Sequence, residues 1–229
     1  MIGIIGAMEE EITEILRHLD SVTEQIIGTR KFYSGTYKNK ALVVALAGIG
    51  KVNAAHTTSL LCENFDVECI INLGVAGGQN GAHHKDVIIA NGVVYHDVDV
   101  TAFSHNQYGQ IPGQPAVFMP DERLKNLALE AKDLIEWSVV EAKVASGDRF
   151  VYSKIPVQKI NALYDDILAI EMEAGAIAHI ASIYKIPFLI IRSISDVVED
   201  LNQATDYESF LSDAVKNATR ILAHVIENY

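Results

Sequence analysis

The chain has 229 residues, of which 49% are hydrophobic and 21% are charged, with 15 Gly and 5 Pro. This composition excludes disordered, collagen-like and low-complexity proteins, and the length is sufficient for one domain, residues 1–229, with a large apolar core. The 18 Lys and Arg against 30 Asp and Glu give a net charge of -12, and the basic residues are scattered, so we expect no nucleic-acid partner.

Short apolar runs alternate with helical patterns along the chain, which predicts an α/β fold with a largely buried sheet. Strands are predicted near residues 2–5, 41–46, 69–73, 87–90, 139–145 and 188–192. Helices are predicted near residues 9–19, 52–63, 121–132, 171–184 and 207–226. Two segments, 95–120 and 154–166, break the pattern. The first contains three of the five prolines, and a long irregular excursion of this kind often carries function.

The ends and cysteines of the chain indicate its compartment. No basic residue precedes the first apolar run, and three glutamates follow it, so the amino terminus does not resemble a secretory signal. No apolar run approaches the length of a membrane span, so we expect no membrane partner. Cys62 and Cys69 show neither a metal-ligand spacing nor a disulfide framework. We therefore expect a cytoplasmic protein.

Glycine-bearing segments follow three predicted strands, at residues 6–11, 47–51 and 74–78. Ligands of α/β sheets bind where parallel strands end, because the loops diverge there and helix amino termini point into the crevice. The GIG at 48–50 lacks the third glycine of a dinucleotide motif, and Lys51 is followed by valine rather than by the Ser or Thr of a P-loop. Each segment can equally be a tight turn that needs positive φ. We expect no cofactor.

Histidines occur in two groups, at 83–84 and in HDVD at 96–99. Neither group has a recognised metal-ligand spacing or a third partner in the sequence. We therefore expect no metal.

Carboxylates are the stronger candidates for chemistry, and three of them are consecutive at 9–11. Helical periodicity puts Glu10 opposite the apolar stripe formed by Met8, Ile12, Ile15, Leu16 and Leu19. Glu9 and Glu11 flank this stripe, and the periodicity does not choose between them. All three carboxylates can equally complement the helix dipole.

Glu171 and Glu173 begin the helix predicted at 171–184, whose next residues are small or apolar nearly all round. Buried carboxylates need partners. Because residues two apart on a helix cannot share a face, we expect the two to differ in role. His179 is expected to be a packed or surface histidine.

Asp196 follows the apolar run 188–195, so its carboxyl group is expected at the edge of the sheet with little water around it. Burial raises a carboxyl pKa, which would allow Asp196 to deliver a proton near neutral pH. The alternative is an N-cap for the following helix.

Six segments together resemble the 5'-methylthioadenosine/S-adenosylhomocysteine nucleosidases, a branch of the purine nucleoside phosphorylase superfamily. They are GIIGAMEEE at 3–11, GIGKV at 48–52, YHDVDVTAF at 95–103, SGD at 146–148, EMEA at 171–174 and SISD at 193–196. The resemblance implies a three-layer fold with a central mixed sheet flanked by helices, and a homodimer. It also implies hydrolysis of the N-glycosidic bond of adenosine thioethers to adenine and a thioribose, in methionine salvage and in removal of a methyl-cycle by-product.

Residue by residue, the resemblance implies Asp196 as the general acid at purine N7, Glu11 as the base for water and Glu173 as the clamp on the ribose hydroxyls. Ser195 would orient Asp196. Further binding positions implied by the resemblance are Met8, Ile49, Gly77, Phe150, Val151, Met172, Tyr207 and Phe210, joined by Phe103 and Pro112 from the partner subunit. The chemistry requires such groups, because adenine leaves only once protonated and the ribosyl group then develops positive charge.

Hydrolysis is favoured over phosphorolysis, because residues 6–11 are acidic where phosphorylases of this superfamily place a basic phosphate ligand. Arg192 is expected to pair with a buried carboxylate. Val75 and Ala47 replace serines of the family pattern, Tyr207 replaces a phenylalanine, and residues 104–108 look one residue longer. Two alternatives stay open: a hydrolase for another 5' substituent, such as a futalosine-type enzyme, and a nucleoside-binding protein without turnover.

Overall fold

The computed structural model describes residues 1–103, 105–198 and 203–229, with side chains from residue 209 onward in the last segment. The strands in this part of the chain are β1 (Ile2–Gly6), β2 (Asp20–Ile27), β3 (Arg30–Tyr37), β4 (Lys40–Leu46), β5 (Cys69–Gly78), β6 (Val87–Tyr95), β7 (Val139–Ser146), β8 (Ile167–Glu171) and β9 (Phe188–Val197). The helices are α1 (Glu9–Leu16), α2 (Lys51–Asn64), α3 (Glu122–Glu130), α4 (Gln158–Asn161), α5 (Ala174–Tyr184) and α6 (Gln203–Asn228), with 3-10 turns at Ala131–Leu134 and Ile155–Val157.

The described strands form one mixed sheet in the order β2-β3-β4-β1-β5-β8-β7-β6-β9. Strand β5 also pairs with β9, so β5, β8, β7, β6 and β9 close into a ring. Strand β1 is parallel to β4 and β5, and β5 is parallel to β9. The carboxyl ends of these four strands therefore lie at the same end of the sheet, where ligands of α/β folds bind.

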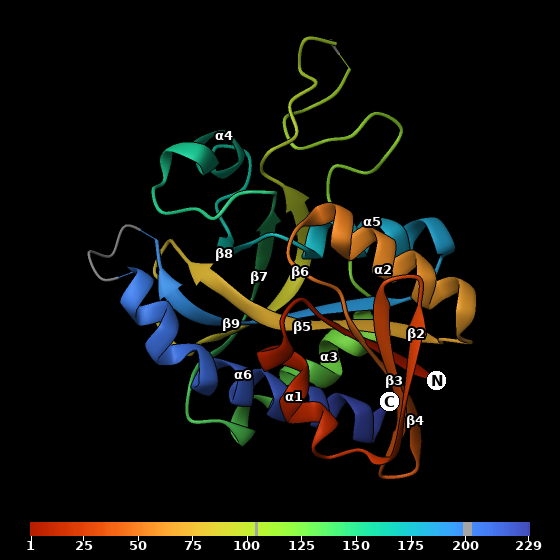
Figure 1. Cartoon of the computed structure of the whole chain (residues 1–229). Helices are drawn as coiled ribbons and strands as arrows, with labels where there is room; N and C mark the ends of the chain where they lie inside the picture. The colour runs from red at the N-terminus through yellow and green to blue at the C-terminus, as the bar shows by residue number, and fades with distance from the viewer. Residues whose placement is uncertain (104, 199–202) are drawn as a thin grey trace.

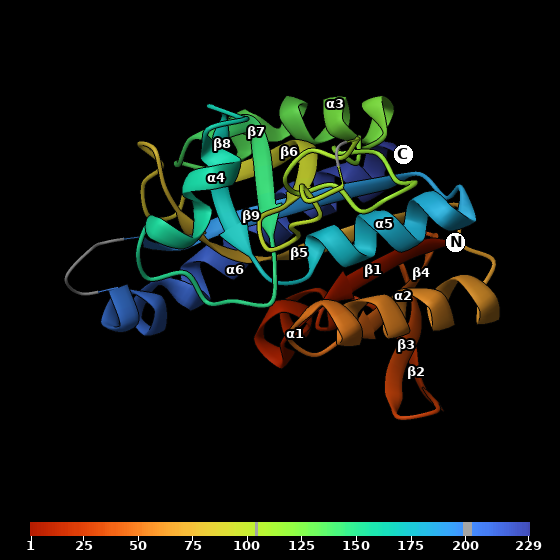
Figure 2. The same ribbon diagram turned by 90° about the horizontal axis from the view of Figure 1, so that it is seen from above.

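Helices cover both faces of the sheet, as Figures 1 and 2 show. Side chains of β1 alternate between the faces. Ile5 joins a core with Leu61 of α2 and Ile177 of α5, whereas Ile4 joins a second core with residues of α1, α3 and α6. The predicted α/β architecture with a mixed central sheet between helices is confirmed.

The predicted strands and helices are all present, but some bounds differ and the structure has further elements. β2, β3 and β8 were not predicted, and 154–166 contains a 3-10 turn and the short helix α4. The segments 74–78 and 193–196, expected as loops, lie inside β5 and β9. The positive φ expected of the glycine segments is found at Gly48 (82°) and Gly50 (95°), whereas the glycines within β5 do not adopt it.

The prediction that Glu171 and Glu173 open a helix was wrong. Glu171 ends β8, and Glu173 has a non-helical backbone with φ of -128° before α5 begins at Ala174. The backbone N–H groups of Glu173 and Ala174 donate to Oε2 of Glu171, at 2.9 and 2.8 Å. Glu171 thus caps α5 from the end of a strand, and the argument from helical spacing does not apply.

The segment between β6 and α3 projects from the sheet at the top of Figure 1. Its described residues form no helix or named strand, as expected, and one bridge joins Phe118 to Val93. His179 packs against Phe118 with ring centroids 5.0 Å apart, which confirms a packed histidine. No helix formed by described residues is long and apolar enough to span a membrane.

Candidate functional site

A cavity of about 270 Å³ opens at the carboxyl ends of β1, β5 and β9, close to the lower limit of about 300 Å³ that is common for small-molecule sites. It is lined by Ala7, Met8, Glu11, Ile49, Val75, Ala76, Gly77, Phe150, Ile170, Glu171, Met172, Glu173, Ser195 and Asp196. The lining is mostly apolar, yet it contains four carboxylates. No lysine, arginine or histidine is among these residues.

Glu11 is fixed by backbone N–H groups from the turn after β1 and from β5. Its Oε2 accepts hydrogen bonds from Ala7 (2.6 Å) and Met8 (3.1 Å), and its Oε1 accepts one from Val75 (3.1 Å). Glu11 is 4% exposed, whereas Glu9 and Glu10 are exposed. Burial raises the pKa of Glu11, and the positive charge of Arg192 and the three N–H groups offset part of that rise. Of the two glutamates that flank the apolar stripe, Glu11 lines the cavity and Glu9 does not.

Gly74 lies against this carboxylate. A Cβ atom built at Gly74 would lie 2.7 Å from Oε1 of Glu11, closer than real Cβ contacts, so the Glu11 carboxylate would have to move. The glycine is needed here for close approach of the β5 backbone to a carboxylate rather than for a turn.

Arg192 and Glu171 form a buried ion pair beneath the cavity. Nη2 of Arg192 donates to Oε2 of Glu171 at 2.8 Å, and the same nitrogen donates a short hydrogen bond to Oδ1 of Asn72. The two charged side chains are 2% and 4% exposed. The pairing predicted for Arg192 is confirmed, and it removes this cation from the cavity.

Glu173 lies beside this pair and accepts a 2.8 Å hydrogen bond from the backbone N–H of Gly50 at Oε1. Burial, followed by the negative charge of Glu171, raises the pKa of Glu173 to about 8. Glu173 therefore holds a proton near neutral pH when the cavity contains no ligand.

Ser195 and Asp196 both line the cavity although they are consecutive residues of β9. Successive side chains of a regular strand point to opposite faces. Here Ala76 pairs with Ile194 and Gly77 pairs with Asp196, so Ser195 is an extra residue in the register. This β-bulge directs both side chains into the cavity. Ser195 Oγ donates to Oδ1 of Asp196 at 2.7 Å, and Asp196 is 1% exposed.

The structure places the remaining implied binding residues in three groups. Met8, Ile49, Gly77, Phe150 and Met172 line the cavity. Val151 and Phe210 do not; Val151 is buried beside Phe150, and the ring of Phe210 packs on His84 at 4.7 Å. Phe103 and Pro112 are exposed on the projecting segment, and the side chain of Tyr207 lies outside the described residues.

Glu171 is the one carboxylate among the described lining residues to which the sequence assigned no specific role. The signal that could have identified it is Arg192, because a buried arginine on a central strand requires a carboxylate partner. Among the described residues, no cluster of His, Cys, Asp and Glu is arranged to hold a metal ion. The arrangement brings the carboxyl groups of Asp196, from β9, and Glu11, from α1, into one cavity.

Comparisons with known proteins agree on one family. The sequence model described as "Phosphorylase superfamily" matches residues 1–227. A relative from Desulfotalea psychrophila, named 5'-methylthioadenosine/S-adenosylhomocysteine nucleosidase, is 37% identical over 227 residues, covering 99% of this chain and 97% of the relative.

Solved structures are similar over the whole chain. The nucleosidase of that name from Neisseria meningitidis, in complex with methylthio-immucillin-A, has a TM-score of 0.94 and 37% identity, and the match covers 100% of this chain and 99% of the other. A futalosine hydrolase from Helicobacter pylori has a TM-score of 0.91 and 32% identity, with 100% and 97% covered.

Proposed function

Because this chain belongs to the phosphorylase superfamily, among its 5'-methylthioadenosine/S-adenosylhomocysteine nucleosidases, we propose that it hydrolyses the N-glycosidic bond of 5'-methylthioadenosine and S-adenosylhomocysteine. The products are adenine and the corresponding thioribose. The observation that carries this proposal is the convergence of Glu11, Glu173 and Asp196 on one nucleoside-sized cavity.

Asp196 is proposed as the general acid. Its carboxyl proton passes to N7 of the purine, and the C1'–N9 bond breaks with its electron pair moving to N9, so adenine leaves as a neutral base. The hydrogen bond from Ser195 to Oδ1 holds the carboxyl group in one orientation. A positioned general acid of this kind increases the reaction rate by roughly 10²- to 10⁴-fold.

Glu11 is proposed as the base. The ribosyl group develops oxocarbenium charge as adenine leaves, and a carboxylate near the sugar stabilises this charge. A water molecule then attacks C1', and its proton passes to Glu11. The three backbone N–H groups on Glu11 fix the direction of its oxygens, so that little reorganisation is needed during the reaction.

Glu173 is proposed to bind the ribose hydroxyls, with Met172 against the sugar and Phe150 stacked on the purine. The apolar lining near Met8 and Ile49 suits a 5'-thioether, which needs no charged partner. Water is favoured over phosphate as the nucleophile by the lack of a basic side chain among the described lining residues.

A homodimer is part of this proposal. Phe103 is 71% exposed on the segment between β6 and α3 and is not among the residues that line the cavity of its own chain, and this position suits a contact with the site of a second copy. We also propose that residues 1–229 act as one domain in the cytoplasm, in methionine salvage and removal of a methyl-cycle by-product. The cysteines Cys62 and Cys69 are free, which suits a reducing compartment.

The test follows free adenine from 5'-methylthioadenosine, S-adenosylhomocysteine, adenosine and futalosine, with and without inorganic phosphate. We expect rapid release from the two thioethers, unchanged by phosphate. Preference for futalosine would replace the proposed substrate, and a requirement for phosphate would replace the proposed reaction. Tight nucleoside binding without release would show a binding protein.

A further inference from the structure

The amino terminus of α2 touches the site through one backbone group. The N–H of Gly50 donates to Oε1 of Glu173, and this bond lowers the pKa of Glu173 from the value that burial alone would give. The position of Glu173 therefore depends on the position of the Gly50 backbone. Gly50 has φ of 95°, a conformation that few residues other than glycine adopt.

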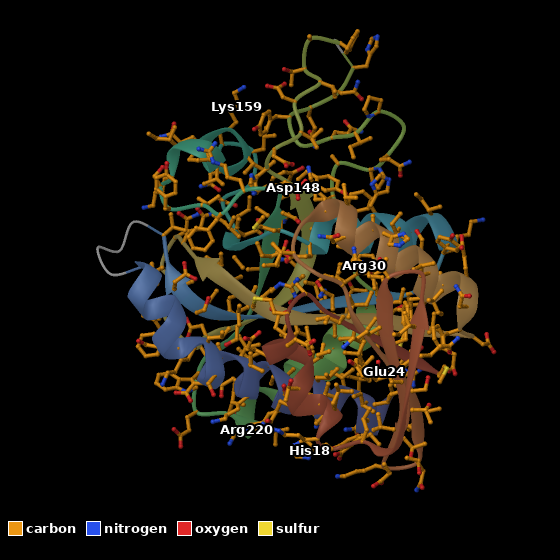
Figure 3. All side chains as sticks on the ribbon, viewed as in Figure 1. His18, Glu24, Arg30, Asp148, Lys159 and Arg220 are labelled. Atoms are coloured by element: carbon orange, nitrogen blue, oxygen red, sulfur yellow. The ribbon has the colours of Figure 1, made fainter. Side chains whose placement is uncertain are left out.

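Helix α2 lacks a capping side chain of its own, because its N-cap residue is Gly50. Asp148, 97 residues later in the chain, supplies the missing acceptor: its Oδ1 accepts the Lys51 N–H at 2.7 Å. A Cβ atom at Gly50 would lie 3.1 Å from the same oxygen. Asp148, labelled in Figure 3, thus fixes the turn that carries the Gly50 N–H.

Asp97 fixes Asp148 in turn. Its Oδ2 accepts the backbone N–H of Asp148 at 2.9 Å and the ammonium of Lys51 at 2.6 Å. A lysine at the first position of a helix is unfavourable beside the positive end of the helix dipole. The carboxylates of Asp97 and Asp148 offset this charge and join three separate segments of the chain.

We propose that Asp148 is a positioning residue for Glu173, acting through the Lys51 and Gly50 backbone. This inference rests on the proposed function, in which Glu173 binds the ribose hydroxyls. The two carboxylates do not need to touch, because the turn at Gly50 transmits the position of one to the other. Its effect should appear with ligands that carry a ribose and not with adenine alone.

A different route from Asp148 to the ligand runs through the chain to Phe150, two residues later, which lines the cavity. If Asp148 acted along that route, its loss would weaken the binding of the purine ring. Adenine, which carries no ribose, distinguishes the two routes.

The experiment measures binding of adenine and of 5'-methylthioadenosine by calorimetry, with Asp148→Ala introduced into an Asp196→Asn background so that the nucleoside is not consumed. We expect affinity for the nucleoside to fall about tenfold, the loss that one misplaced hydrogen bond produces. Affinity for adenine should not change. Asp148→Asn keeps an acceptor at Oδ1 and should restore most of the nucleoside affinity.

Asp121→Ala is the matched control. Asp121 caps α3, far from the cavity, by accepting the Leu124 N–H at 3.0 Å. Its loss removes a helix cap of the same kind and should lower thermal stability as Asp148→Ala does, with no change in either affinity. Equal loss of affinity for adenine and nucleoside in Asp148→Ala, or loss of neither, would overturn the proposal.

Turnover supplies an independent readout through Glu173. The double variant Asp148→Ala with Glu173→Ala should lose no more kcat/KM than Glu173→Ala alone, because without the Glu173 side chain the position of the Gly50 N–H no longer affects the contact with the ribose. Multiplied losses would contradict the proposed route. If the parent protein binds the nucleoside without releasing adenine, the proposed function is refuted, and the affinity comparison still decides the role of Asp148. If the parent binds no nucleoside, the proposed function and the role of Asp148 are both overturned.

Discussion

Ser195 and its neighbour Asp196 face the same cavity and share a 2.7 Å hydrogen bond, an arrangement that an unbroken strand cannot provide. The bulge at Ser195 makes it possible, since it shifts the register of β9 against β5 by one residue. The backbone of β5 comes close at this point: a Cβ atom on Gly77 would lie 3.2 Å from Oδ2 of Asp196. The register of β9 therefore sets the direction of the proposed acid.

Asp196→Asn should reduce adenine release by about 10²- to 10⁴-fold, because it removes the proton donor at nearly constant volume. Circular dichroism and thermal unfolding should match the parent protein. Ser195→Ala, which removes the orienting hydroxyl and keeps the acid, should reduce adenine release less than Asp196→Asn does. Turnover by Asp196→Asn at the parent's rate would refute the role of the acid.

Glu11→Gln should lose activity on the same scale, about 10²- to 10⁴-fold, because the amide cannot accept the proton of water. Glu10→Gln is the matched control, since Glu10 is an exposed neighbour of the same charge in the same helical turn. It should keep nearly full activity. Similar losses in both variants would indicate an effect of charge at the helix terminus rather than of a base.

Stability should fall with rising pH because of Glu173. Its pKa is about 8 in the folded protein against an ordinary value of 4.5, so the folded state holds this proton more tightly than the unfolded state. The resulting stabilisation is complete below about pH 4.5 and is lost as the pH rises through about 8. Relative to Glu173→Gln, which does not titrate, the parent should lose up to about 1.4 kcal/mol of unfolding free energy per pH unit in this window.

Urea denaturation of both proteins at several pH values between about 5 and about 9 provides the measurement. A difference between parent and variant that stays constant across this range would show that Glu173 is ionised throughout.

Arg192→Met should destabilise the fold by about 3–5 kcal/mol, because it leaves the buried carboxylate of Glu171 without its partner. Denaturant unfolding measures this loss. Lys159→Met breaks the exposed pair with Asp99, far out on the surface in Figure 3, and should leave the unfolding free energy nearly unchanged. Equal effects of the two variants would mean that Arg192 is not held by a buried ion pair.

Sequence patterns predicted the layers of the fold, because long apolar runs such as β1 and β9 and the periodic helix α1 have strong signals. They failed at β2, whose residues are nearly all exposed and show no alternation. They also failed at β8, because its five residues run directly into the α5 segment and a short apolar run cannot be told from a helix by periodicity.

The sequence alone predicted only part of the candidate site. Periodicity removed Glu10 but could not choose between Glu9 and Glu11, because the deciding partners are backbone groups of separate segments, Ala7 directly after β1 and Val75 within β5. The role of Asp148 was equally hidden, since a helix cap supplied 97 residues away leaves no local pattern. Contacts between distant segments decide both.

The ring of five strands has a consequence for how copies of this protein meet in concentrated solution. Because β9 pairs with β5, β2 is the one strand of the described sheet that has a neighbour on one side only. It belongs to the β2–β3 hairpin that projects in Figure 2. Exposed Val22 and Ile26 on β2 would favour pairing with a strand of another molecule. The exposed Glu24 lies between them in the sequence of β2, and a charged side chain on an edge strand opposes such pairing.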